Sequence, residues 1–161
     1  MIFGNKKIFA VECEKSGTFS GTKIVQACLY INNQKIGVFE ETAISGTILL
    51  AIASFLKFSN LRCSEENTDH TAFDMIYKSM YGRDWRIGIE KNYRDKYSIH
   101  DIFEIAVADQ GYVVYLTTFS QENSRILIGS REGKYFGSVD VCEKYVNHMF
   151  LKIFDWIEEE E

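Results

Sequence analysis

The sequence predicts an α+β fold, in which a mainly antiparallel sheet built from two meanders carries about three helices. Segments of β-type residues form two groups, one within the first forty residues and one after residue 99. Apolar residues at helical spacing lie between these groups and again at the end of the chain. Strands and helices that are grouped separately favour antiparallel sheets over the alternating units of a parallel sheet. With 161 residues and no internal repeat or dividing linker, the chain is expected to form one domain, 1–161.

The first meander is expected to contain three short strands. They cover residues 8–14, 23–31 and 35–39, where apolar and β-branched residues predominate. Small residues at 15–21 predict a loop between the first two strands. Asn32-Asn33-Gln34 predicts a tight turn before the third, because Asn tolerates the left-handed backbone that such turns need.

The middle of the chain predicts two helices and a short strand. Residues 47–58 are apolar on nearly all sides, as in a helix that its neighbours cover. Residues 71–81 carry apolar side chains at helical spacing, with Thr71 and Asp74 in capping-box positions. Residues 85–89, Trp-Arg-Ile-Gly-Ile, favour a short strand after the second helix.

The second meander is expected to begin near residue 100. Two strands, 101–108 and 112–119, flank Asp109-Gln110-Gly111, which is a hairpin signature. Residues 125–129 predict the next strand, and residues 134–136 a short one after a turn.

The last element is predicted to be an amphipathic helix that begins after Ser138. The Ser138 hydroxyl can cap the helix, and Asp140 would place negative charge in its first turn, which suits the helix dipole. One apolar stripe should face the core, formed by Val139, Cys142, Val146, Met149, Ile153 and Trp156.

The charge of the chain bears on its partners. The net charge is −5, the basic residues are scattered, and the longest charge run is the acidic stretch 158–161. Negative charge disfavours binding to nucleic acid or to an anionic membrane and favours a basic protein partner. Plain solubility explains the same charge, and both interpretations stay open.

The cysteines predict a reducing compartment. Cys13, Cys28, Cys63 and Cys142 form no C-x-x-C pair and no zinc spacing, and two of them, Cys28 and Cys142, sit in apolar runs. No signal peptide is visible, and the apolar stretch 43–56 falls short of the roughly 20 residues that a membrane helix needs. We therefore expect free thiols and a cytoplasmic protein.

No catalytic, cofactor-binding or metal-binding motif stands out. His100 and Asp101 are adjacent, so on the predicted strand they would face opposite sides, which makes a poor dyad. Asp84, Glu90 and Lys91 are the nearest approach to the clustered acids of a metal-dependent nuclease. Ordinary surface charge is the simpler interpretation, and we expect no enzyme and no cofactor.

Acidic residues are better candidates for recognition. Glu40 and Glu41 close the first meander, and Glu65, Glu66 and Asp69 mark the loop between the two middle helices. Each group suits a basic partner, and each also suits a solvated surface.

The two ends of the chain carry three N-terminal motifs with Gly37 and two C-terminal motifs with Gly133: Met-Ile-Phe-Gly at 1–4, Phe-Ala-Val-Glu at 9–12, Leu-Tyr-Ile-Asn at 29–32, Ser-Arg-Ile-Leu-Ile at 124–128 and Asp-Trp-Ile at 155–157. In these motifs the chain resembles the immunity protein 42 family of bacterial polymorphic toxin and contact-dependent inhibition systems. Asn33 stands where the family has a hairpin Gly.

The resemblance implies a cytoplasmic antitoxin that binds and occludes the toxin domain of a cognate effector. Many such toxins are basic nucleases, which an acidic inhibitor would attract. Interface energy concentrates in exposed Trp, Tyr and Arg, so we expect contacts at Trp85, Tyr93, Tyr97 and Tyr135. A non-catalytic scaffold domain without a toxin partner is the alternative, and a small hydrolase or nuclease is a third hypothesis.

Overall fold

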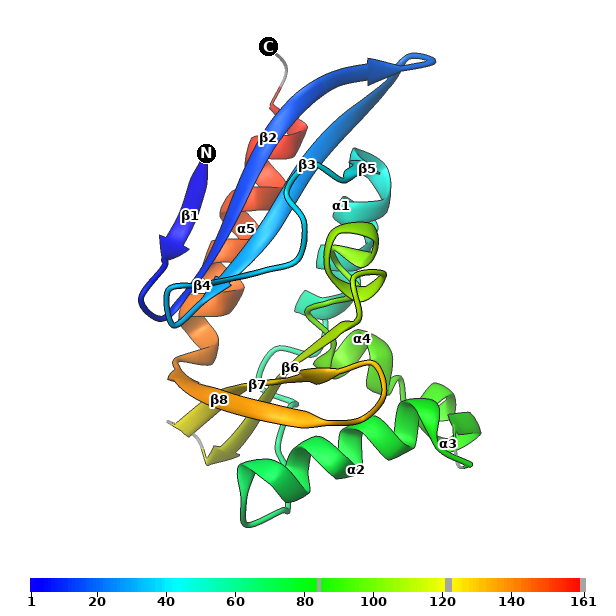
Figure 1. The fold of residues 1–161 in the computed structure, drawn as a ribbon, viewed down its shortest axis with the longest axis vertical. Coiled ribbons are helices and arrows are strands. Elements are labelled where there is room, and N and C mark those ends of the chain that lie inside the picture. Colours follow the sequence, from blue (N-terminus) through cyan, green and yellow to red (C-terminus); the bar gives the residue numbers. More distant parts are fainter. Residues whose placement is uncertain (84, 121–122, 160–161) are drawn as a thin grey trace.

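A computed structural model describes residues 1–83, 85–120 and 123–159, and it shows two antiparallel sheets with helices packed on them (Figure 1). The α+β class predicted from the sequence is thus confirmed, with two sheets in place of one. In chain order the elements are β1 Ile2–Asn5, β2 Phe9–Phe19, β3 Thr22–Ile31, β4 Gln34–Ile36, β5 Thr42–Ile44, α1 Ser45–Leu56, α2 Asp69–Tyr81, α3 Trp85–Glu90, α4 Tyr93–Tyr97, the π-helix η1 Glu104–Ala108, β6 Tyr112–Ser120, β7 Asn123–Ser130, β8 Tyr135–Val141 and α5 Glu143–Glu158.

The first sheet has the order β1-β2-β3-β4, and β5 pairs with the other end of β3. The predicted turn is confirmed: Asn32 and Asn33 have φ of 51° and 63°, the left-handed backbone that the turn needs. The loop predicted at 15–21 is wrong. Strands β2 and β3 stay paired out to Phe19 and Thr22, and a bulge between Lys15 and Gly17 absorbs the irregularity.

Strand β1, which periodicity did not predict, depends on a glycine for its close approach to β2 and α5. Gly4 has φ of 95°, and a Cβ there would lie 2.6 Å from the Phe9 carbonyl oxygen and 2.7 Å from the Tyr145 hydroxyl. That hydroxyl donates a hydrogen bond of 2.8 Å to the same carbonyl. The opening motif therefore lets the N-terminal strand approach α5 closely.

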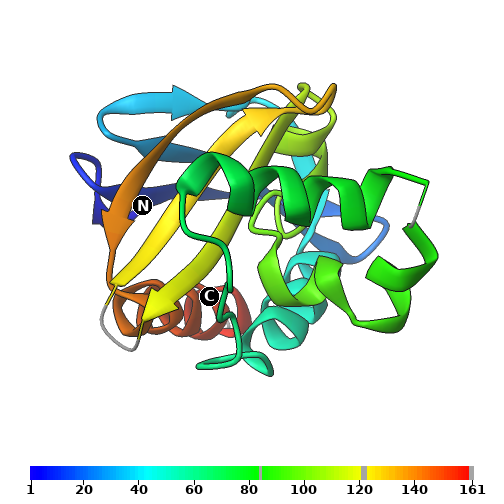
Figure 2. The same cartoon turned by 90° about the horizontal axis from the view of Figure 1, so that it is seen from below.

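The second sheet, β6-β7-β8, is a middle layer with one apolar face toward each neighbour. Val114, Leu116 and Ile126 join the main core with the first sheet, α1 and α5. Alternate residues, Val113, Tyr115 and Leu127, face the other side of the sheet. There they form a smaller aromatic cluster under α2 with Ala72, Phe73, Ile76 and Tyr97. Figure 2 shows α2 crossing this face of the sheet.

Helix α5 is the predicted C-terminal helix with a later start. Val146, Met149 and Ile153 are buried as expected. The helix begins at Glu143, because Ser138 and Asp140 extend strand β8 beyond the short strand predicted at 134–136. The first two residues of the predicted apolar stripe are therefore outside the helix. Val139 lies in β8, and Cys142 precedes the helix and is exposed.

Two predicted strands are helical. Residues 85–89 belong to α3, and residues 101–108 form a turn followed by the π-helix. In the second segment the buried side chains are Ile102, Phe103, Ala106, Val107 and Ala108. Ile102, Phe103, Ala106 and Val107 recur at spacings of one and four residues, which is a helical pattern. The cap of α2 also shifts by three residues, because Thr68 and Thr71 form the capping box.

All four cysteines are free, and Cys13 and Cys28 are buried in the first sheet. Burial raises the pKa of the Cys13 thiol to about 12, which keeps this side chain protonated. Across the described ranges, every helix is too short or too polar to cross a bilayer.

Candidate functional site

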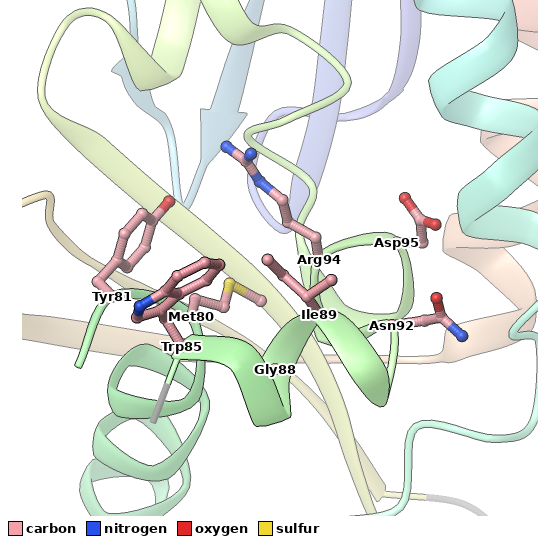
Figure 3. Close-up of a pocket in the computed structure, with 8 residues that line it drawn as sticks. All are labelled: Met80, Tyr81, Trp85, Gly88, Ile89, Asn92, Arg94 and Asp95. Atoms are coloured by element: carbon pink, nitrogen blue, oxygen red, sulfur yellow. The ribbon is translucent and has the colours of Figure 1, made fainter. Parts of the chain in front are cut away.

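A hollow of about 600 Å³ opens between the end of α2, α3 and α4 (Figure 3). Its lining is mainly apolar, with polar groups from α4 on one side. The lining residues are Met80, Tyr81, Trp85, Gly88, Ile89, Asn92, Arg94 and Asp95. A hollow with this composition is typical of a binding site for an apolar group with a few fixed polar contacts.

Three apolar side chains of the hollow are exposed to solvent, whereas Met80 is half-buried. Ile89 is 62% exposed, Trp85 46% and Tyr81 37%. Trp85 and Ile89 lie four residues apart, so α3 presents both on one face. Large apolar side chains that gather in a hollow mark an interaction surface more strongly than the same residues scattered singly.

Gly88 sets the position of α3 against α2. A Cβ at this buried position would overlap the backbone carbonyl of Ser79, in the last turn of α2. Only glycine lets the two helices come this close. The spacing of the walls of the hollow therefore depends on a residue that contributes almost no surface itself.

A buried histidine contacts Tyr81, one of the residues that line the hollow. His100 is fully buried, and its Nε2 lies 3.2 Å from the hydroxyl of Tyr81. Its Nδ1 lies 3.1 Å from the backbone nitrogen of Val114 and 3.0 Å from the carbonyl oxygen of the same residue. Burial lowers the pKa of His100, so the ring is neutral, and burial raises the pKa of the Tyr81 phenol.

The polar wall rests on an ion pair. Arg94 donates two hydrogen bonds to Asp101, Nε to Oδ2 at 3.1 Å and Nη2 to Oδ1 at 3.2 Å. The Asp101 carboxylate raises the pKa of Arg94. Next to this pair lies a second hollow of about 210 Å³, lined by Arg94, Asp95, Asp101 and Glu104.

The predicted aromatic contacts lie at different depths. Trp85 lines the hollow, whereas Tyr93 is half-buried and its ring stacks 5.3 Å from that of Tyr97. Tyr97 is 2% exposed, so it belongs to the aromatic cluster under α2 and offers a partner almost no surface. Tyr135 is half-buried on β8, with its ring 5.5 Å from that of Phe73.

The predicted acidic contacts do not gather at one place. Glu40 and Glu41 are exposed before β5, beside the first sheet, whereas the other three lie before or at the start of α2, near the opposite end of the molecule (Figure 1). There Glu65 is exposed and Glu66 is half-buried. Asp69 accepts a hydrogen bond from Ser138 and lies 3.6 Å from Nε of Arg125.

Ile89, Tyr81, Arg94, Asp95 and Glu104 were missed as candidates. The available signal was the i, i+4 spacing of Trp85 and Ile89, which favours one face of a helix. The same spacing also fits one face of a strand, because strand residues an even number apart share a face. The spacing alone therefore did not distinguish a helix from a strand.

No metal site is apparent where the structure is described. Across residues 1–83, 85–120 and 123–159, His, Cys, Asp and Glu side chains form no group of three that could hold a metal ion. Asp84 lies outside these ranges, and the side chain of Glu90 is not described. The prediction that His100 and Asp101 face opposite sides is wrong, because a turn forms there instead of a strand and His100 Nε2 lies 3.8 Å from Asp101 Oδ1. The imidazole is fully buried and also contacts Tyr81 and Val114.

One family model matches most of the chain, and one solved structure shares its fold. The family model described as immunity protein 42 matches residues 1–156. The crystal structure of CdiI from Burkholderia dolosa AUO158 has a similar fold, with a TM-score of 0.73 at 14% identity over 97% of this chain and 99% of that one. A search of curated proteins gives no match.

Proposed function

Because the chain belongs to the immunity protein 42 family, we propose that it neutralises the toxin domain of its cognate effector by binding and occluding it. The observation that carries the proposal is the family match over residues 1–156. The exposed apolar hollow between α2, α3 and α4 supports it, because a binding protein needs surface that is free to be covered.

The proposed toxin is a basic protein of the nuclease class, and the chain binds it in the cytoplasm. The net charge of −5 supports this choice, since opposite charges steer two proteins together and raise the association rate. We propose that residues 1–161 act as one domain without catalysis. The main core supports the single domain, because it joins residues of both sheets with α1 and α5.

Co-expression with the toxin domain encoded next to this chain tests the proposal. We expect the two proteins to purify as a complex and the chain to restore growth of cells that make the toxin. A folded chain that neither binds nor rescues would contradict the proposal and favour a scaffold domain. Nuclease activity of the free toxin, and its loss in the complex, would test the proposed class of toxin separately.

A further inference from the structure

The apolar hollow adjoins the acidic one. The two share Arg94 and Asp95, which line both. One surface therefore offers apolar contacts on its α3 side and carboxylates on the side of the π-helix. This adjacency of apolar and acidic groups distinguishes the surface from other exposed apolar residues, such as Phe19 on the β2–β3 hairpin and Leu50 on α1.

The apolar half has room for a large side chain and the backbone beside it. Its volume of about 600 Å³ lies within the usual range of binding pockets. Trp85 and Ile89 form one side, and Met80 reaches into it from α2, as Figure 3 shows. An aromatic or branched aliphatic side chain placed there would remove both exposed residues from water, which is favourable.

The acidic half carries an excess of negative charge. Three carboxylates, of Asp95, Asp101 and Glu104, line it together with one guanidinium, that of Arg94. Asp101 pairs with that guanidinium, whereas Asp95 and Glu104 are exposed. A lysine or arginine of a partner would be attracted to these two carboxylates.

We infer that these two hollows are the docking surface for the toxin, and that the occupant is a toxin segment with a large apolar side chain next to a Lys or Arg. The apolar side chain packs between Trp85 and Ile89, and the cation lies near Asp95 and Glu104. This inference rests on the proposed function, and it names the surface and the chemistry of the segment that the surface takes.

Binding of the cognate toxin domain to variants of the full chain tests the inference. Ile89→Ala and Trp85→Ala should raise Kd by about 10-fold or more, as truncation of central interface residues does. Glu104→Gln should slow association at low salt, and the difference from the unchanged chain should shrink at high salt. Leu50→Ala and Glu132→Gln are the matched controls, because both residues are exposed outside the two hollows, and Kd should change less than about 2-fold.

The outcomes separate this inference from the proposed function. A tight complex of the unchanged chain that tolerates Ile89→Ala, Trp85→Ala and Glu104→Gln would overturn the inference alone. Failure of the unchanged, folded chain to bind the toxin would overturn both. Sedimentation of the isolated chain tests whether a second copy of the chain occupies the hollow. A dimer that Trp85→Ala dissociates would assign the hollow to that second copy and overturn the inference.

Discussion

The fully buried guanidinium of Arg62 pairs with the carboxylate of Glu143, 81 residues further along the chain. Glu143 is the first residue of α5, and its carboxylate also accepts hydrogen bonds from the Asn60 backbone and the Thr118 hydroxyl, each 3.0 Å long. The guanidinium donates to the carbonyl of Phe55 as well. The end of α1, strand β6 and the start of α5 are thus joined through one buried ion pair.

Removing one partner of this pair should be costly. Arg62→Met leaves the Glu143 carboxylate buried without its cation, so we expect the free energy of unfolding to fall by about 3–5 kcal/mol. Arg131→Met is the control, because Arg131 pairs with Asp109 at the surface, and its loss should cost less than about 1 kcal/mol. Urea unfolding measures both. Equal effects of the two substitutions would contradict a structural role for the buried pair.

Gly88→Ala should disturb the hollow more than the rest of the fold. The added methyl group overlaps the Ser79 carbonyl, so α3 must shift, with an expected loss of about 1–3 kcal/mol. Gly46→Ala is the matched control, since a Cβ there meets nothing within 4 Å, and this exposed helical site should become more stable by up to about 1 kcal/mol.

Tryptophan fluorescence can locate the change. The chain has only two tryptophans, so in a Trp156→Phe background the emission reports on Trp85 alone. Gly88→Ala should shift that emission and Gly46→Ala should leave it unchanged. An unshifted emission in Gly88→Ala would mean that the α2–α3 contact does not position Trp85.

His100 should make stability depend on pH. Burial lowers its pKa in the folded protein below that of the unfolded chain, about 6.5. The unfolded state therefore binds the proton more readily. The stabilising effect is complete above about pH 6.5 and is lost as pH falls below it, by up to about 1.4 kcal/mol per pH unit.

Urea unfolding between pH 5 and 8 measures this dependence. His100→Gln should flatten the part of the slope below pH 6.5, whereas His148→Gln, at an exposed position, should keep it. The comparison with His100→Gln is needed because carboxylates also titrate at the acid end of the range. Parallel curves for the original chain and His100→Gln would assign the slope to other groups.

The sequence predicted those elements that have one clear period and ordinary caps. Strands β2 and β3, helices α1 and α2 and most of α5 follow this pattern, as does the turn at Asn32 and Asn33. The prediction of a strand was wrong at 101–108, where the chain forms a turn and a π-helix. The turn and π-helix at 101–108 cover the main core with Phe103 and Val107, so they are as apolar as a buried strand.

The candidate site was only partly predictable, for a physical reason. Trp85 was chosen because tryptophan is frequent at interfaces, and it lies in the hollow. Tyr97 was chosen on the same ground, yet it is buried, because residue type carries no information about which face of α4 meets the core. Tyr81 and Arg94 are placed by His100 and Asp101, which contact them only after folding.

The separate aromatic cluster under α2 has a consequence for how such a protein can diversify. Met80 and Tyr93 pack against that cluster, so the hollow stands above the smaller of the two cores. Substitutions around α3 and α4 would mainly change the packing of this smaller core. They would change least the packing of the larger core, which unites both sheets with α1 and α5. A lineage can therefore exchange one binding specificity for another while the larger part of its architecture is inherited unchanged.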